Sequence, residues 1–230
     1  MILPQLISGR LLGRPNRFTV QVALEDESTV LAHCPNTGSM LGCSQPQQPI
    51  CLSKSQNPRR KLAYTWEMIR MPSSWVGVNT MRTNHIVLEA LQNELIPEFA
   101  GYAKIQQEVK TSTNSRLDFL LQDSSWPGLY LEVKSCTWVR DKIASFPDAP
   151  TLRGQKHLAL LRDLQAQGFQ TAILFLIQRE DAVAFSPAQD IDPKYASLLQ
   201  EARNTGTKIL AYDVRLSFEG ISVHKRIPLL

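Results

Sequence analysis

The sequence lacks the long apolar segments that membrane and secreted proteins carry. Its longest purely apolar run, residues 172–177, covers six positions, whereas a helix that crosses a bilayer needs about 20. Residues 1–5 have neither the basic start nor the apolar stretch of a secretory signal. We therefore expect a cytoplasmic protein with no membrane partner.

Cysteine is also scarce, and its spacing does not indicate a zinc ribbon or a thioredoxin-type motif. The four cysteines form no CxxC pair, and no two histidines stand at the spacing of a zinc site. Three of the cysteines gather in the first third of the chain beside His33, which leaves a metal or disulfide role as an alternative. Reduced, buried thiols are the simpler expectation.

Three common catalytic motifs are absent as well. The chain contains no GxxxxGK loop, no GxSxG elbow and no HExxH helix. These absences argue against a P-loop NTPase, an α/β-hydrolase and a zincin.

What the sequence has is an ordinary globular composition with an uneven charge distribution. Of its 230 residues, 43% are hydrophobic and 20% charged, and the net charge is +4, so a buried core is expected. Residues 1–80 hold eight basic and four acidic residues, and the rest of the chain holds 17 of each. The excess charge of the first third suits a module that meets a polyanion, although a solvated basic face without a partner would look the same.

Residues 1–80 read as short strands separated by turns. We expect strands at 18–24, 29–33, 50–52, 62–71 and 75–78, with a forced turn at Pro35-Asn36-Thr37-Gly38. About five short strands with little helix favour a small closed barrel, of which the OB-fold is the commonest five-stranded type.

The same module combines basic and aromatic side chains, as single-strand binders do. The residues that we expect to contact a nucleic acid here are Arg14, Arg17, Arg59, Arg60 and Lys61. Tyr64, Trp66 and Trp75 stand nearby as candidate base-stacking platforms, although aromatic residues more often belong to the core.

Residues 81–230 alternate between helix and strand patterns and form the second domain. In chain order we expect a helix at 84–95, strands at 102–110, 116–122 and 129–135, a helix at 151–167, a buried central strand at 171–178, a helix at 193–205, and strands at 208–216 and 221–226. This order predicts a mixed sheet with helices on its faces.

Two of these strands carry the residues that point to chemistry. Side chains alternate along a strand, so Glu132 and Lys134 project together from one face. The same rule places Leu117, Phe119 and Leu121 on one face of the preceding strand and Asp118 on the other. If the two strands pair as a hairpin, Asp118 and Glu132 meet across the ladder.

Two adjacent carboxylates repel each other unless a cation lies between them, and Mg²⁺ takes one or two carboxylates together with water and phosphate. We therefore predict that Asp118 and Glu132 hold Mg²⁺ or Mn²⁺, with Glu89 of the preceding helix as a further ligand. The metal would polarise a phosphodiester and lower the pKa of a bound water, while Lys134 positions that water or stabilises negative charge. An exposed helix carboxylate is an equally good reading of Glu89.

Basic residues stand in the first turns of the helix at 151–167, where they oppose the helix dipole. A choice that is locally unfavourable suggests function. Arg153 and Lys156 are expected to clamp phosphates, and Gln155 to contact a nucleotide or the attacking water. His157 is read as a capping or surface histidine.

These residues lie in motifs that resemble the bacterial sugar fermentation stimulation protein (SfsA) family over the whole chain. The motifs, in the same order, are residues 33–40 (HCPNTGSM), 78–80 (VNT), 115–119 (SRLDF), 131–135 (LEVKS), 146–149 (FPDA) and 153–158 (RGQKHL). One departure is residues 110–114, where a glycine-containing turn would be expected; it affects a loop and not the metal patch.

The resemblance implies a mixed α and β protein with two domains. Residues 1–80 would form an OB-fold, and residues 81–230 a PD-(D/E)XK, restriction-endonuclease-like domain with Asp118, Glu132 and Lys134 at its signature positions. It also implies binding of DNA or RNA with low sequence specificity and a role in sugar (maltose) utilisation. Two functions follow, a metal-dependent nuclease or a non-cleaving DNA-binding regulator, and Lys134 favours the first. The oligomeric state stays open, a homodimer included.

Overall fold

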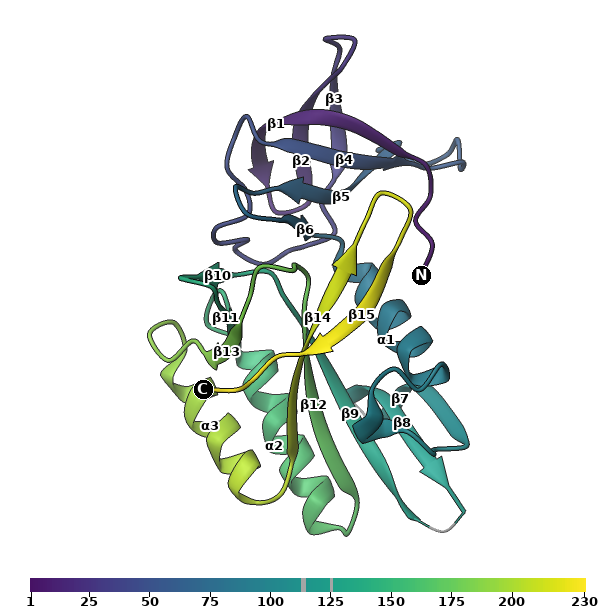
Figure 1. The fold of residues 1–230 in the computed structure, drawn as a ribbon, viewed down its shortest axis with the longest axis vertical. Helices are drawn as coiled ribbons and strands as arrows, with labels where there is room; N and C mark the ends of the chain where they lie inside the picture. The colour runs from purple at the N-terminus through teal and green to yellow at the C-terminus, as the bar shows by residue number, and fades with distance from the viewer. Residues whose placement is uncertain (113–114, 125) are drawn as a thin grey trace.

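Five strands of the N-terminal region form a closed barrel. The computed structural model describes residues 1–112, 115–124 and 126–230, and Figure 1 shows the barrel above a larger domain. The barrel strands are β1 Leu6–Asn16, β2 Thr19–Leu24, β3 Thr29–His33, β4 Pro49–Lys54 and β5 Tyr64–Arg70. They follow the order β3-β2-β1-β4-β5, and a β3–β5 pairing closes the ring. Strand β6 (Trp75–Gly77) pairs antiparallel with β5.

The sequence patterns predict β2 to β6 but not β1, which is the longest strand of the barrel and pairs with both β2 and β4. Gly9, Gly13 and Pro15 interrupt its pattern, and each weakens the strand signal. Register shifts on either side of Gly13 explain how the strand accommodates them.

Most of the barrel aromatics belong to its packing. Trp66 is fully buried, and its indole N–H donates to the carbonyl oxygen of Met68 at 2.9 Å. Trp75 packs edge-on against Phe218 of the second domain, with ring centroids 5.3 Å apart. Of the two readings of Trp66, the structure supports the favoured one, a core residue, and not the alternative of a stacking platform.

A short connection leads from the barrel to helix α1 (Thr83–Gln92) by way of the 3-10 turn η1 (Thr80–Arg82). The helix ends earlier than the predicted residue 95, because Glu94 adopts a left-handed φ of 52°. The amide of Leu95 then donates to the carbonyl of Ala90 at 2.9 Å, the pattern of a Schellman cap. A second 3-10 turn, η2 (Pro97–Phe99), follows.

The second domain is built on a six-stranded mixed sheet of order β15-β14-β12-β9-β8-β7. Its strands are β7 Lys104–Ser112, β8 Ser115–Asp123, β9 Trp126–Cys136, β12 Gln170–Ile177, β14 Lys208–Leu216 and β15 Ile221–Arg226. The three predicted strands β7, β8 and β9 form an antiparallel meander. As predicted, β12 is central, and it runs parallel to both β9 and β14. Residues 113 and 114, in the segment that departs from the family pattern, lie outside the described residues.

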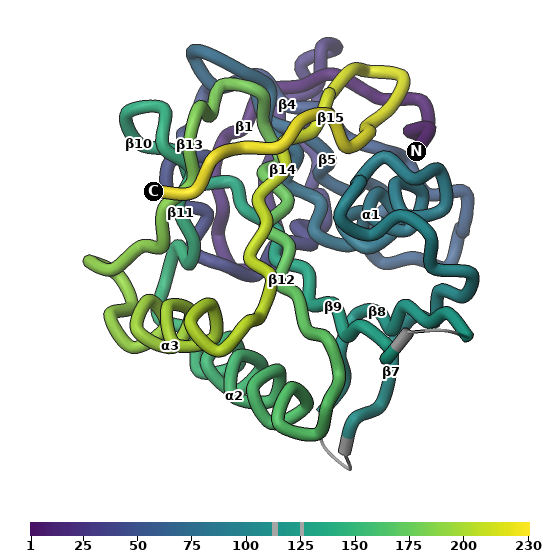
Figure 2. The backbone as a smooth tube through the Cα atoms, turned by 60° about the horizontal axis from the view of Figure 1, so that its bottom comes forward, coloured from purple at the N-terminus to yellow at the C-terminus, as the bar shows by residue number. Residues whose placement is uncertain are grey.

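Helices cover both faces of this sheet (Figures 1 and 2). Helix α1 packs on one face, and α2 (Leu152–Ala166) and α3 (Pro193–Asn204) pack on the other. Strand β12 alternates between the two cores, since Leu174 belongs to the α1 side and Phe175 to the α2 side. Gly168, which has a left-handed φ of 92°, directly follows the C-cap residue of α2 and ends the helix, as the sequence predicts.

A small sheet that the sequence analysis treated as loop lies at the end of the domain near the barrel. Its strands are β10 Val139–Arg140, β11 Ile143–Phe146 and β13 Ala184–Pro187, in the order β10-β11-β13. Strands of two to four residues leave no periodic pattern to read. The segment Phe146 to Pro150 follows directly from β11.

The helices and the cysteines bear on two of the expectations drawn from the sequence. Within the described residues, no helix is both long and apolar enough to span a membrane. All four cysteines are buried and free, as the reading of reduced thiols predicts.

Candidate active site

Asp118 and Glu132 stand opposite each other in the register of strands β8 and β9, just beyond the Phe119–Leu131 pair. The ladder pairs Phe119 with Leu131, and the next step of that register sets Asp118 opposite Glu132. Instead of a further backbone pairing, the amide of Val133 donates to Asp118 Oδ2 at 2.8 Å. The predicted hairpin and register are thus confirmed, and the Asp118 carboxylate lies between the two strands.

The strict alternation predicted for β8 breaks at this point. Phe119 and Leu121 pack in the α1-side core, but Leu117 joins the core on the α2 side. In β7, Glu108 stands opposite Asp118 by the same register and has a left-handed φ of 54°. Such local irregularity re-aims a side chain, and here it frees Asp118 from the regular pleat.

Helix α1 reaches this carboxylate through Asn84, which the sequence analysis did not single out. Asn84 Nδ2 donates to Asp118 Oδ1 at 2.8 Å. Burial and the neighbouring charge of Glu132 raise the pKa of Asp118 to about 6, even though both hydrogen bonds favour the carboxylate. Asp118 is therefore a carboxylate that a cation would stabilise.

Glu132 is almost completely buried, with 3% of its surface exposed. Its Oε1 atom accepts from Lys134 Nζ at 2.6 Å and contacts His157 Nδ1. Burial by itself raises the pKa of Glu132, but the bonds and charges of His157 and Lys134 outweigh that effect and leave the pKa lowered. The prediction that Glu132 and Lys134 project side by side is confirmed.

His157 was misread as a capping or surface residue. It is buried, and it projects from the second turn of α2 onto Glu132. Helical spacing could have revealed this, since His157 shares the buried face of α2 with Gly154, Leu158 and Leu161.

The other oxygen of Glu132, Oε2, is buried and has no hydrogen-bond partner within the described residues. A buried carboxylate oxygen without a partner is costly, and a divalent cation is a natural partner for it. Within the described residues, no group of three or more His, Cys, Asp or Glu side chains is placed to hold a metal ion. Two carboxylates nevertheless suit Mg²⁺, which keeps several waters. The residues present therefore fit the metal.

Glu89 does not join the carboxylate pair, in contrast to the prediction. Its carboxylate pairs with the N-terminal ammonium of Met1 at 2.6 Å and is 47% exposed. Glu89 follows Asn84 by five residues, which turns it about 140° around the helix. Asn84, not Glu89, is the α1 residue that faces Asp118.

The N-terminal turns of α2 hold the other predicted contacts. Arg153 and Lys156 are exposed. The side-chain amide of Gln155 instead donates to both carboxylate oxygens of Asp192, at 3.0 and 3.1 Å, and Asp192 also caps the N-terminus of α3. The structure thus gives Gln155 a role in joining α2 to α3, which the sequence prediction did not foresee.

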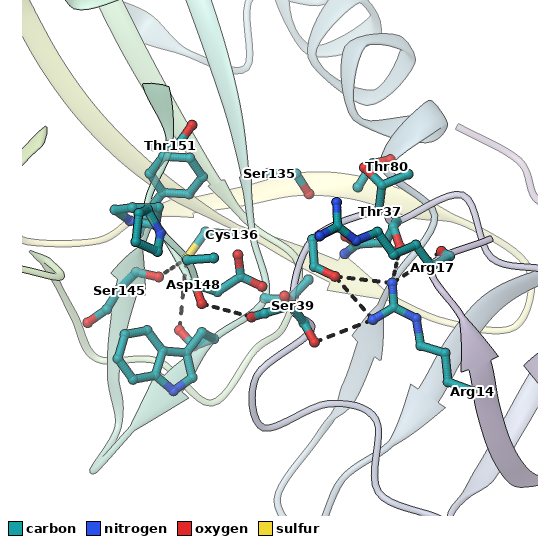
Figure 3. A pocket seen from close by; sticks show the side chains of 18 residues that line it. Arg14, Arg17, Thr37, Ser39, Thr80, Ser135, Cys136, Ser145, Asp148 and Thr151 are labelled. Carbon is teal, nitrogen blue, oxygen red and sulfur yellow. Dashed lines mark hydrogen bonds between the residues drawn. The ribbon is translucent and has the colours of Figure 1, made fainter. Parts of the chain in front are cut away.

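A cleft of about 530 Å³ lies between the barrel and the second domain (Figure 3). Arg14 and Arg17 stand on its barrel side, and Asp148 stands opposite them. Arg14 is held in place by the carbonyl oxygens of Asn36, Gly38 and Arg17, at 2.8 to 3.2 Å. It therefore shapes the wall of the cleft, and Arg17 is the exposed arginine of the pair.

The loop 36–40 of the barrel is bound to the second domain at this cleft. Ser39 Oγ donates to the carbonyl of Asp148 at 2.8 Å, and the Met40 amide donates to its carboxylate at 2.9 Å. A Cβ atom at Gly38 would lie 3.3 Å from both carboxylate oxygens, so the close approach favours glycine.

A second groove, of about 610 Å³, contains Asp118, Asn84 and Glu108. Thr80 and Ser135 line both the groove and the cleft. The two depressions are therefore neighbours. Of the catalytic candidates, Asp118 lines the groove, whereas neither depression is lined by Glu132 or Lys134.

The remaining predicted contacts lie elsewhere on the barrel. Arg59, Arg60 and Lys61 occupy the connection between β4 and β5, next to Leu6 at the start of β1. Arg14 lies eight residues further along β1, roughly 25 Å of strand away. The structure does not bring this cluster to the cleft.

Comparisons with known proteins agree with the two-part fold. Residues 12–78 match the family model of the SfsA N-terminal OB domain, and residues 81–220 match that of the sugar fermentation stimulation protein RE domain. Sugar fermentation stimulation protein homologs of Geobacter sulfurreducens and Desulfotalea psychrophila are similar to this chain. The first is 46% identical over 100% of this chain and 99% of its own length, and the second 47% identical over 95% and 92%.

One solved structure is similar over its whole length. The structure of Pyrococcus furiosus SfsA in complex with Ca²⁺ superposes with a TM-score of 0.91 at 26% identity, over 100% of this chain and 98% of that one. The predicted fold class is confirmed in that an OB barrel is followed by a mixed α/β domain, which matches the RE domain of the family model. From these matches, the chain belongs to the sugar fermentation stimulation protein (SfsA) family.

Proposed function

We propose that this protein is a divalent-metal-dependent nuclease that hydrolyses phosphodiester bonds in DNA or RNA with low sequence specificity. The observation that carries the proposal is the buried, unpartnered Oε2 atom of Glu132 beside Asp118. Its other oxygen is already satisfied by Lys134 and His157. A carboxylate held in this way leaves one oxygen free for a cation.

Asp118 and Glu132 are the residues that would hold Mg²⁺ or Mn²⁺, in the manner of a PD-(D/E)XK site. When bound, such a cation supplies Lewis-acid polarisation of a phosphodiester. A related SfsA structure contains Ca²⁺, which supports divalent-cation binding in this family. The raised pKa of Asp118, about 6, gives a further reason, since a cation would favour its ionised form.

Lys134 supplies the positive charge that a purely structural metal site would not need. Its side chain is 12% exposed, and its ammonium lies 2.6 Å from Glu132 Oε1. In a poorly solvated site, a fixed ammonium stabilises the negative charge that develops on the phosphoryl oxygens. His157 is a positioning residue, because it fixes Glu132 and would not itself contact the substrate.

Exposed basic side chains around the site would bind the nucleic acid backbone. Arg153 and Lys156 stand at the N-terminal end of α2, where the free amides of the helix add to their attraction for phosphate. Arg17 stands in the cleft. The cluster at Arg59, Arg60 and Lys61 would add a more distant contact.

The test is a cleavage assay on labelled single- and double-stranded DNA and RNA, with Mg²⁺, with Mn²⁺ and with EDTA. We expect cleavage by the wild type with either metal, and its loss with EDTA, in Glu132→Gln and in Lys134→Ala. Glu89→Gln is the matched control and should cleave as the wild type does, because Glu89 lies outside the site.

Equal cleavage by the wild type and both site variants would identify a contaminating nuclease and refute the proposal. Binding without any cleavage would instead favour a DNA-binding regulator of sugar utilisation on a nuclease scaffold.

A further inference from the structure

The cleft between the barrel and the second domain has the size and polarity of a nucleotide site. Its volume of about 530 Å³ falls among pockets that hold small organic ligands, roughly 300–1,000 Å³. Both domains contribute walls, and the loop 36–40 is fixed to Asp148 by two hydrogen bonds. The walls are thus held in place before any ligand arrives, which lowers the entropic cost of binding.

The two sides of the cleft differ in charge. On the barrel side, Arg14 donates to carbonyl oxygens, which leave its positive charge uncancelled. Arg17 is exposed, and Figure 3 shows its side chain extending into the cleft. This side would attract a phosphate.

The opposite side is unsuited to a phosphate and suited to a base. Asp148 repels anions, but its carboxylate accepts from N–H groups such as those of a base. Phe146, which is half-buried, lines the same cleft and provides aromatic surface, whereas the ring of Trp138 is buried and lies under the Arg140 guanidinium. A nucleotide would therefore enter with its phosphate toward Arg17 and its base toward Asp148.

The cleft also lies within reach of the carboxylate pair. Ser135 lines both the cleft and the groove that contains Asp118. It follows Glu132 by three residues on β9, about 10 Å of strand. A strand with one nucleotide in the cleft can thus continue past Ser135 to the carboxylates.

We propose that this cleft binds one nucleotide of a single-stranded nucleic acid and so makes single strands the preferred substrate. The inference rests on the proposed function in taking nucleic acid as the ligand. A duplex keeps its bases paired and stacked, and it would have to unpair one of them to fill the cleft.

Binding of short labelled oligonucleotides to the full chain in EDTA tests this inference without requiring cleavage. The probes are an oligodeoxycytidylate, an oligoribocytidylate and a DNA duplex of the same length, and fluorescence anisotropy gives each Kd. We expect at least one single strand to bind more tightly than the duplex. The two single-strand arms distinguish DNA from RNA as the ligand.

Two variants locate the binding in the cleft. Thr37→Trp places an indole in it, since Thr37 is exposed and lines the cleft, and should weaken single-strand binding about tenfold, whereas Thr37→Ser should not. Arg17→Ala should weaken it by a similar factor. Each phosphate contact to a single strand adds about 0.7 to the slope of log K against log salt concentration, so the loss of one contact should reduce that slope by about 0.7. Arg10→Ala removes an exposed arginine of β1, which donates to the carbonyl of Gln47 and does not line the cleft, and serves as the charge-matched control.

Tighter binding of the duplex by the wild type, or unchanged single-strand binding by Thr37→Trp, would overturn the inference. Failure of the proposed function looks different, because it appears as absent metal-dependent cleavage and leaves these affinities as they are.

Discussion

Replacing Asp118 with asparagine should make the free energy of unfolding less dependent on pH. The folded-state pKa of Asp118 is about 6, compared with an ordinary value of 3.8, chiefly because the carboxyl is buried and secondly because Glu132 is close. The folded protein therefore binds this proton more tightly than the unfolded chain does. Asp118 contributes stability that is fully present below about pH 4 and is lost as the pH rises through about 6.

The size of this loss follows from the shift in pKa. A shift of about two units corresponds to about 3 kcal/mol between the protonated and ionised forms. The assay is urea denaturation of the wild type and of Asp118→Asn in EDTA, at several values between pH 4 and pH 8. Relative to the wild type, the variant should gain about 2.5 kcal/mol of unfolding free energy from pH 4 to pH 8, because part of the roughly 3 kcal/mol is already lost at pH 4.

Comparison across pH removes the effects that do not titrate. Changes in the hydrogen bonds from Asn84 and Val133 alter the stability of the variant at every pH. Because His157 and Lys134 lower the pKa of Glu132, Glu132 is ionised in both proteins over most of this range. A constant difference between wild type and variant over the whole range would refute the reasoning, because it would mean that Asp118 titrates alike in the folded and unfolded chains.

Three further predictions concern metal binding, the buried ion pair and the contact between domains. Mg²⁺ at a concentration about 100 times its Kd should raise the unfolding free energy by about 3 kcal/mol. At a fixed Mg²⁺ concentration the gain should be larger at pH 8 than at pH 5, because protons compete with the metal for Asp118. Calorimetry should find no gain in Glu132→Gln. His157→Ala should lower the unfolding free energy by about 2 kcal/mol through loss of a hydrogen bond to the buried charge of Glu132. In a urea titration, His157→Gln, which keeps a donor, should be more stable than His157→Ala, and equal stability of the two variants would contradict this account. Asp148→Ala should lower the unfolding free energy by about 1 kcal/mol and speed proteolysis within residues 36–47. Asp148→Asn keeps an acceptor for the Met40 amide and should be digested more slowly than Asp148→Ala. Equal digestion of both variants would count against the contact.

The sequence patterns were most informative where one periodic face is buried. Strands β8, β9 and β12 and helices α2 and α3 follow from alternation, apolar runs and end residues such as Gly168. The pairing of Asp118 with Glu132 also follows, because a hairpin register and the period of two fix which side chains meet.

The patterns failed where tertiary contacts decide. Strand β1 contains Gly9, Gly13 and Pro15, and it is a strand because β2 and β4 pair with both of its edges. Strands as short as β10 give no pattern to detect. No local rule links a barrel loop to Asp148, more than 100 residues away along the chain.

The candidate site divides in the same way. Asp118, Glu132 and Lys134 could be chosen from two strands, but their partners come from helices whose placement the sequence does not give. Asn84 and Glu89 are both polar residues of α1, and only packing on the sheet determines that Asn84 faces Asp118. His157 could have been found from its helical spacing, whereas the bond from Gln155 to Asp192 could not.

The measurement that bears most directly on the central claim is the single-turnover cleavage rate of Lys134→Ala in saturating Mg²⁺, with substrate affinity measured alongside. If Lys134 stabilises charge that develops during phosphodiester hydrolysis, the rate should fall by at least about 100-fold while the Kd for nucleic acid stays within a few-fold of the wild type. A wild-type rate in this variant, or no Mg²⁺-dependent cleavage by the wild type, would contradict the assignment of Asp118, Glu132 and Lys134 as a nuclease site.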